Sequence, residues 1–156
     1  LLETVFFFFN AKTGIYAMQE VMQRTGKDIP LMLSATVNDT SGRLLSGQTL
    51  EAFLISVSHA PLLSIGLNCS FGAGQMLPVL RNLHRMLTDR AGERGRVFIS
   101  CHPNAGLPNS MGQYDVTPDQ FAQSISPMLD ERLVDIIGGC CGTTPEHIKA
   151  VVDLCR

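Results

Sequence analysis

Short apolar runs recur along the chain, with starts about 30 residues apart, which is the length of one strand–helix unit. The runs are Leu1–Phe6, Pro30–Val37, Leu63–Cys69, Arg96–Cys101 and Leu133–Gly138. Polar or glycine-rich residues follow each run, and a segment with helical spacing of apolar residues comes next. Because strands that alternate with helices pair in parallel, the pattern predicts an α/β protein with five strand–helix units in one parallel sheet.

The first three helical segments carry start and stop signals of different strength. Asn10 is a suitable N-cap for the first helix, and Gly26 is the residue type that most often ends a helix in the left-handed conformation. The second helix is expected over Gly47–His59. The third presents one apolar stripe at helical spacing, formed by Met76, Leu80, Leu83 and Leu87.

The last two helices have the clearest beginnings. Thr117–Gln120 combines a threonine N-cap, proline at the first helical position and glutamine three residues on, which is a capping box. Thr144 and Pro145 repeat the cap and the proline. One charged insertion, Asp89–Arg96, is expected to be a solvated loop.

Two architectures satisfy five strand–helix units. One is a five-stranded doubly wound sheet, and the other is five units of an eight-stranded (β/α)8 barrel, which takes about 250 residues when complete. The apolar pattern does not choose between them. In both, ligands bind at the carboxyl ends of the strands, so polar and ligating residues at those ends are the candidates for a site.

Length and charge limit the classes of protein to which the chain can belong. The 156 residues suffice for one domain, and a net charge of −2 without a basic run argues against nucleic acid or an anionic membrane as partner. The most apolar stretch, Val5–Phe9, is too short to cross a bilayer. The chain starts at Leu1 rather than Met, directly on an apolar run, which suggests a fragment whose N-terminal part is absent.

The chain has five cysteines, and three of them stand at predicted strand ends. Cys69 ends the third apolar run, while Cys140 and Cys141 follow the fifth between glycines that allow the backbone to turn. All three thiols should therefore lie at one end of the sheet. Three thiolates with one open position are typical of a catalytic zinc site.

The cysteines also have simpler interpretations. Cys140 and Cys141 could form a redox pair, although a disulfide between neighbours is strained. Any single cysteine can be a small core residue, and we assign that role to Cys101 and to Cys155 on the stripe of the last helix. An odd number of cysteines with two adjacent does not suggest a disulfide framework, so a reduced, cytoplasmic chain is expected.

Two motifs around these cysteines resemble the zinc motifs of the homocysteine S-methyltransferase family. They are Gly-Leu-Asn-Cys at Gly66–Cys69 and Gly-Gly-Cys-Cys-Gly-Thr-Thr-Pro-Glu-His-Ile at Gly138–Ile148. Three further stretches are more similar to the homocysteine-binding domain of cobalamin-dependent methionine synthases than to betaine-dependent relatives: Asn10–Lys12, Ser46–Phe53 and His102–Asn109. The resemblance extends over essentially the whole chain.

The resemblance implies a fold and a metal. The family fold is a (β/α)8 TIM barrel, of which this chain would supply strands four to eight, so residues 1–156 would be the C-terminal portion of the homocysteine-binding domain. The implied zinc ligands are Cys69, Cys140 and Cys141.

The resemblance also implies substrate contacts. Glu3 matches the glutamate that holds the amino group of homocysteine. Asn104 matches an asparagine near the metal, which can occupy the fourth position when substrate is absent. Asn68 and Thr36 would line the same pocket at the strand ends, and His102, which follows the fourth run, could shape it without ligating zinc.

The implied function is zinc-dependent activation of the homocysteine thiol for methyl transfer from methylcobalamin, forming methionine. The cobalamin- and folate-binding modules of such an enzyme would be the partners. Alternatives are a methyltransferase that uses betaine or S-methylmethionine, and a non-catalytic zinc-binding remnant. Two departures from the family pattern leave the non-catalytic remnant as an alternative. Phe7 stands where the pattern has aspartate, and the first three strands are missing, so the fragment alone could be inactive.

Overall fold

The computed structural model describes residues 1–89 and 97–156, and its centre is one parallel sheet. The strands lie in the order of the sequence, each pairing in parallel with the next. They are β1 (Leu2–Val5), β2 (Leu31–Ala35), β3 (Leu62–Gly72), β4 (Phe98–Asn104) and β5 (Ile136–Ile137). The five predicted strands are confirmed, with ends that differ by a few residues.

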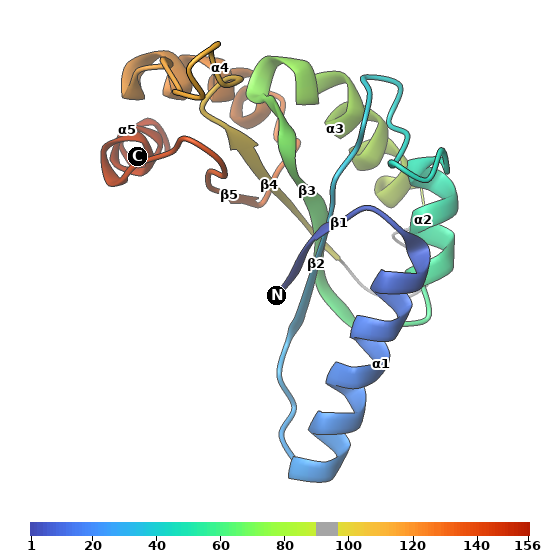
Figure 1. Ribbon diagram of the computed structural model, residues 1–156. Helices are drawn as coiled ribbons and strands as arrows, with labels where there is room; N and C mark the ends of the chain where they lie inside the picture. The colour runs from blue at the N-terminus through green and yellow to red at the C-terminus, as the bar shows by residue number, and fades with distance from the viewer. Residues whose placement is uncertain (90–96) are drawn as a thin grey trace.

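Five helices alternate with the strands and follow one another in an arc along one side of the sheet (Figure 1). They are α1 (Phe8–Thr25), α2 (Leu50–Val57), α3 (Ala73–Thr88), α4 (Pro118–Asp130) and α5 (Pro145–Leu154). Right-handed crossovers between strands in unbroken order place every helix on the same side, whereas a doubly wound sheet reverses its strand order. The fold is therefore part of a barrel, with a sheet that is not closed among the described residues.

The two faces of the sheet differ in chemistry. Leu33, Ile65 and Ile99 are in register, are buried, and belong to the apolar core that the helices cover. The opposite face carries small and polar residues, with Gly66 in register with Ser100. A Cβ on Gly66 would lie 2.0 Å from the Ser100 carbonyl oxygen, so only glycine fits there. The polar face is the one that turns toward the inside of a barrel.

The start of α1 was predicted wrongly, whereas its end is confirmed. The helix begins at Phe8 rather than after Asn10, because the Phe7 carbonyl accepts the Ala11 N–H and the Phe8 ring packs on Phe53, 5.6 Å between ring centres. An apolar contact thus replaces a side-chain cap. Gly26 ends the helix at a φ of 65°.

Helix α2 is shorter than predicted. Residues 47–49 belong to a turn in which Arg43 bridges to Thr49, and the Thr49 side chain then caps the helix by accepting the Ala52 N–H. The capping box at Thr117 is confirmed, since Thr117 and Gln120 exchange backbone-to-side-chain hydrogen bonds. The prediction of a solvated loop over 89–96 falls, apart from its first residue, outside the described residues.

Two further predictions concern the remaining cysteines and membranes. Cys101 is fully buried in the core, as predicted, and burial raises the pKa of its thiol. Cys155 was wrongly assigned to the core: α5 ends at Leu154, so Cys155 stands at the helix C-cap and is exposed. None of the helices in the described residues is long and apolar enough to cross a membrane.

Candidate metal centre

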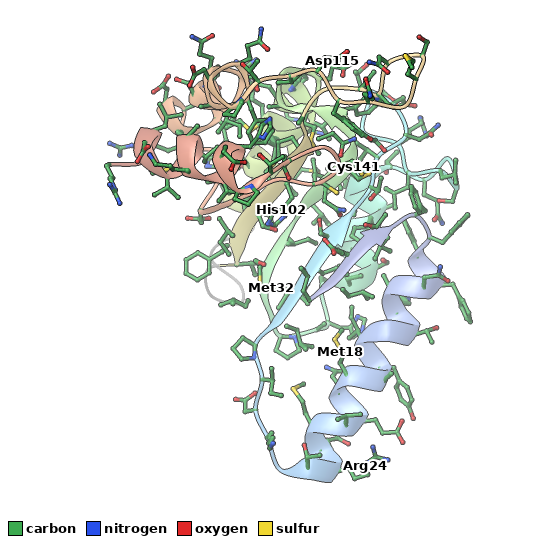
Figure 2. All side chains as sticks on the ribbon, turned by 60° about the vertical axis from the view of Figure 1, so that its left-hand side comes forward. Met18, Arg24, Met32, His102, Asp115 and Cys141 are labelled. Atoms are coloured by element: carbon green, nitrogen blue, oxygen red, sulfur yellow. The ribbon has the colours of Figure 1, made fainter. Side chains whose placement is uncertain are left out.

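The sulfur atoms of Cys69, Cys140 and Cys141 come together at the carboxyl end of the sheet. The Cys69 and Cys141 sulfurs are 3.7 Å apart, and those of Cys140 and Cys141 are 4.0 Å apart. All three lie within 4.8 Å of one another and form the one such cluster of potential ligands among the described residues. Figure 2 shows Cys141 at this end and Met32 toward the other end of the sheet.

Left-handed backbone turns the first cysteine toward the other two. Cys69 and Ser70 have φ angles of 63° and 62°, which are uncommon outside glycine. The pairing of β3 with β4 is irregular at the same place, between Asn68 and Gly72. Strain of this kind costs about 1–3 kcal/mol per residue and is typical of functional sites.

The loop that carries Cys140 and Cys141 is fixed to the end of β4. The Cys140 N–H donates to the Pro103 carbonyl at 2.8 Å, and the Ala105 N–H donates to the Cys141 carbonyl at 2.9 Å. Because β5 has ended at Ile137, the two cysteines are not forced to opposite faces, and their sulfurs converge as the sequence predicted.

The spacing of the sulfurs suits a tetrahedral zinc ion. With zinc–sulfur bonds of about 2.3 Å, two sulfurs of a tetrahedron lie about 3.8 Å apart. The 3.7 and 4.0 Å separations are close to that value. The three residues present therefore fit a zinc ion with one further position for another ligand.

The surroundings of Cys140 disfavour ionisation of its thiol. The pKa of Cys140 is raised to about 11, first by burial and then by the charges of Cys69 and Cys141, while a hydrogen bond from Asn68 acts in the opposite direction. A bound cation would oppose this effect by stabilising the Cys140 thiolate.

Asn68 connects three strands beneath the cysteines. Its Oδ1 accepts the Thr4 N–H at 3.0 Å and the Ser34 hydroxyl at 2.7 Å, and its Nδ2 donates to Thr4 Oγ1 at 2.8 Å. The same amide nitrogen lies 3.9 Å from the Cys140 sulfur. Asn68 is fully buried and thus holds β1 and β2 against the end of β3 that carries Cys69.

Asn104 and Thr36 lie at the same end of the sheet. The Asn104 side-chain oxygen accepts the Cys141 N–H at 3.1 Å, so this amide fixes the cysteine loop. Thr36 is fully buried, and its hydroxyl has no hydrogen-bond partner among the described residues. A buried hydroxyl without a partner is available to a ligand.

Glu3 and His102 occupy the polar side of the sheet. His102 is in register with Asn68, and its ring lies over Gly138, where an added Cβ would be 2.6 Å from a ring carbon. Burial lowers the pKa of His102, and the carboxylate of the exposed Glu3 partly offsets this. The two groups are therefore close enough to interact electrostatically.

Comparison with known proteins decides the family. The sequence model described as Homocysteine S-methyltransferase matches residues 1–155. The chain belongs to the homocysteine S-methyltransferase family. Its structure is similar to the metallated form of the homocysteine methyltransferase MmuM from Escherichia coli, with a TM-score of 0.61 and 23% sequence identity over 88% of this chain. The match covers 39% of the MmuM chain.

Two side chains that contact or belong to the segment around Cys140 and Cys141 were not identified as part of the site from the sequence. The Tyr114 ring lies against Gly142, directly after Cys141. His147 accepts the Thr144 N–H at 3.2 Å through Nδ1 and donates from Nε2 to the Val116 carbonyl at 2.8 Å. His147 is buried and caps the start of α5. The contacts of Tyr114 with Gly142 and of His147 with Val116 have no signal in local sequence spacing, because each joins separate segments.

Proposed function

We propose that this chain is the zinc-binding portion of a homocysteine-binding domain that activates the homocysteine thiol for methyl transfer. The observation that carries the proposal is the convergence of three cysteine sulfurs at separations suited to zinc. Membership of the homocysteine S-methyltransferase family supplies the substrate class. The chain spans 39% of the length of the MmuM structure, so catalysis by the complete domain is part of the proposal.

Zinc, when bound, would act as a Lewis acid that ionises a coordinated thiol. The protein's own contribution would be to hold zinc through Cys69, Cys140 and Cys141, a set that leaves one ligand to be supplied by the substrate. Asn68 and Asn104 keep the ligand-bearing segments in place through the hydrogen bonds described above.

Substrate would be oriented by residues on the same side of the sheet. Glu3 would bind the amino group of homocysteine, because an exposed carboxylate on β1 is free to pair with an ammonium ion. Thr36 would contribute a buried hydroxyl, and Asn104 would contribute an amide beside the cysteine loop. The ring of His102 would line one side of the substrate site. Phe7, which stands where the family pattern has aspartate, is exposed at the start of α1 and adds no charge.

We further propose methylcobalamin as the methyl donor, held by a separate cobalamin-binding module that works with a folate-binding module in the cytoplasm. The similarity of Ser46–Phe53 and His102–Asn109 to cobalamin-dependent methionine synthases supports this choice. The protein should remove the methyl group from methylcobalamin when homocysteine is added, measured as loss of the methylcobalamin absorption. Methionine formed from betaine or S-methylmethionine instead would exclude the cobalamin assignment.

The zinc site is tested by metal analysis of the purified chain. We expect one zinc per chain, and its loss in Cys69→Ser and in Cys141→Ser. Cys155→Ser is the matched control: Cys155 is the exposed C-cap residue of α5 and is not one of the three clustered cysteines, so its replacement should leave the zinc content unchanged.

The response to substrate is tested on the same zinc-loaded protein. Addition of homocysteine should change the zinc absorption-edge spectrum, as a fourth sulfur enters the coordination sphere. A folded chain without zinc would refute the metal assignment, and a zinc-loaded chain whose spectrum ignores homocysteine would indicate a non-catalytic zinc-binding remnant.

A further inference from the structure

Strand β1 is irregular at Thr4. Leu2 pairs with Leu33 and Val5 with Ala35, so β1 has one residue more than β2 between these two positions. Thr4 has a φ of 58°, in the left-handed region that β-branched residues rarely adopt. An extra residue in this conformation is a β-bulge, which redirects the side chains around it. Strain of this kind persists only where the surrounding structure holds it in place.

The bulge determines which side chains of β1 face the polar side of the sheet. Val5 is buried in the apolar core, and Leu2 packs against that core, so both point toward the helices. Side chains alternate along a regular strand, and a regular β1 with Val5 in the core would turn Glu3 toward the helices as well. Because of the extra residue, Glu3 and Thr4 both lie between the two core residues and are exposed on the polar side.

The Asn68 side chain holds Thr4 through two hydrogen bonds, which we call the Thr4–Asn68 clamp. Asn68 Oδ1 accepts the Thr4 N–H at 3.0 Å, and Nδ2 donates to the Thr4 hydroxyl oxygen at 2.8 Å. The clamp passes over β2, which lies between β1 and β3 and whose Ser34 hydroxyl donates to the same Oδ1 at 2.7 Å. Asn68 directly precedes Cys69 in the chain. The clamp therefore joins the residue after Glu3 to the residue before one of the clustered cysteines.

We propose that Thr4 is a positioning residue: the Thr4–Asn68 clamp fixes the Glu3 carboxylate at a set distance from the metal site, so that the site selects a thiol amino acid of the length of homocysteine. The inference rests on the proposed function, in which Glu3 binds the amino group and the metal binds the sulfur. A substrate held at both ends must match the separation of the two groups that hold it. Without the clamp, β1 would be fixed by β2 alone among the described strands, and the contact of Glu3 with the amino group would weaken.

The test measures thiol binding to cobalt-substituted protein, in which a thiol that enters the coordination sphere changes the sulfur-to-cobalt absorption. Homocysteine is compared with γ-mercaptobutyrate, which has the same chain and carboxylate but lacks the amino group. Thr4→Val removes the hydroxyl and keeps a branched side chain, whereas Thr4→Ser keeps the hydroxyl. Thr13→Val is the matched control, because Thr13 is exposed on α1.

We expect Thr4→Val to weaken homocysteine binding about tenfold, which corresponds to partial loss of one hydrogen bond between charged groups, and to leave γ-mercaptobutyrate binding unchanged. The preference for homocysteine over cysteine, which is one methylene shorter, should fall as well. Thr4→Ser and Thr13→Val should bind both thiols as the parent does. In a Glu3→Gln background Thr4→Val should have no further effect, because Thr4 acts through the Glu3 carboxylate.

Thr4→Gly is a second variant without the hydroxyl, and glycine adopts a φ of 58° without strain. It should show the same loss of homocysteine binding with unchanged binding of γ-mercaptobutyrate. It takes the place of Thr4→Val if valine at this position prevents folding.

The outcomes separate this inference from the proposed function. A parent protein that binds no metal, or whose metal spectrum ignores homocysteine, would overturn both. Parental homocysteine binding in Thr4→Val and Thr4→Gly would overturn the role of Thr4 alone. Equal weakening of homocysteine and γ-mercaptobutyrate, loss of metal in both variants, or a full effect of Thr4→Val in the Glu3→Gln background would also overturn that role, because the clamp would then support the metal site or the fold rather than Glu3.

Discussion

Replacement of Asn68 by alanine removes the side chain that joins three strands below the candidate metal centre. Asn68 is fully buried, and three of its hydrogen bonds are 3.0 Å or shorter: from the Thr4 N–H, from the Ser34 hydroxyl and to the Thr4 hydroxyl. Alanine would leave the Thr4 N–H and the fully buried Ser34 hydroxyl without their acceptor. The perturbation is therefore a loss of polar pairing combined with a small cavity.

The magnitude follows from these contacts. At about 1 kcal/mol net for each hydrogen bond, three bonds amount to about 3 kcal/mol, and the buried Ser34 hydroxyl left without an acceptor makes this a lower estimate. With an unfolding slope of about 2 kcal/mol per molar urea, the midpoint should fall by about 1.5 M.

Urea unfolding followed by far-ultraviolet circular dichroism measures this change. Asn82→Ala is the matched control: Asn82 lies on α3, where its side chain accepts an exposed hydrogen bond from Arg85, so its replacement should change stability by less than about 0.5 kcal/mol. If Asn68→Ala and Asn82→Ala lost the same free energy, Asn68 would not be the connection between strands that we describe.

Three further substitutions test the packing and the buried thiol. Gly66→Ala should destabilise the fold by about 1–3 kcal/mol, because its Cβ would meet the Ser100 carbonyl oxygen at 2.0 Å. Gly74→Ala, with nothing within 4 Å, should instead stabilise α3 by up to about 1 kcal/mol, and equal effects in thermal unfolding would contradict the close approach of β3 and β4. The Cys101 thiol has a pKa raised by burial, so its contribution to stability is complete below the unfolded-state pKa and is lost as pH rises toward the folded-state value. The free energy of unfolding should therefore fall between pH 7 and pH 10, and this fall should be about 2 kcal/mol smaller in Cys101→Ala than in the parent. An equal fall in both proteins would refute burial of this thiol.

The succession of strands and helices could be predicted from the sequence, because it depends on local regularities. Apolar runs mark the buried strands, and the Thr117 capping box marks a helix start that the structure reproduces. The start of α1 could not be predicted from capping rules, because Phe8 is held by Phe53, a residue far along the chain. Local propensity is overridden where a long-range apolar contact is available.

In the candidate site, too, some features could be predicted from the sequence and others could not. The meeting of Cys69, Cys140 and Cys141 could be predicted, since parallel strands end at a common edge. The left-handed backbone at Cys69 could not, because cysteine has no preference for that conformation. The contact of Tyr114 with the Cys141 loop also lacks a local signal, since it depends on how two loops after different strands pack.

The unbroken strand order has a consequence for how the molecule folds. Each strand pairs with its successor in the sequence, so the sheet can grow one unit at a time through contacts of modest sequence separation. The sulfur cluster is different, because Cys69 and Cys141 are 72 residues apart and closing a loop of that length costs about 4 kcal/mol of chain entropy. We expect the cluster to assemble only after the last strand–helix unit, β5 and α5, has packed onto the sheet. A metal ion would then bind only to completely folded chains, and it would hold the ends of the sheet together afterwards.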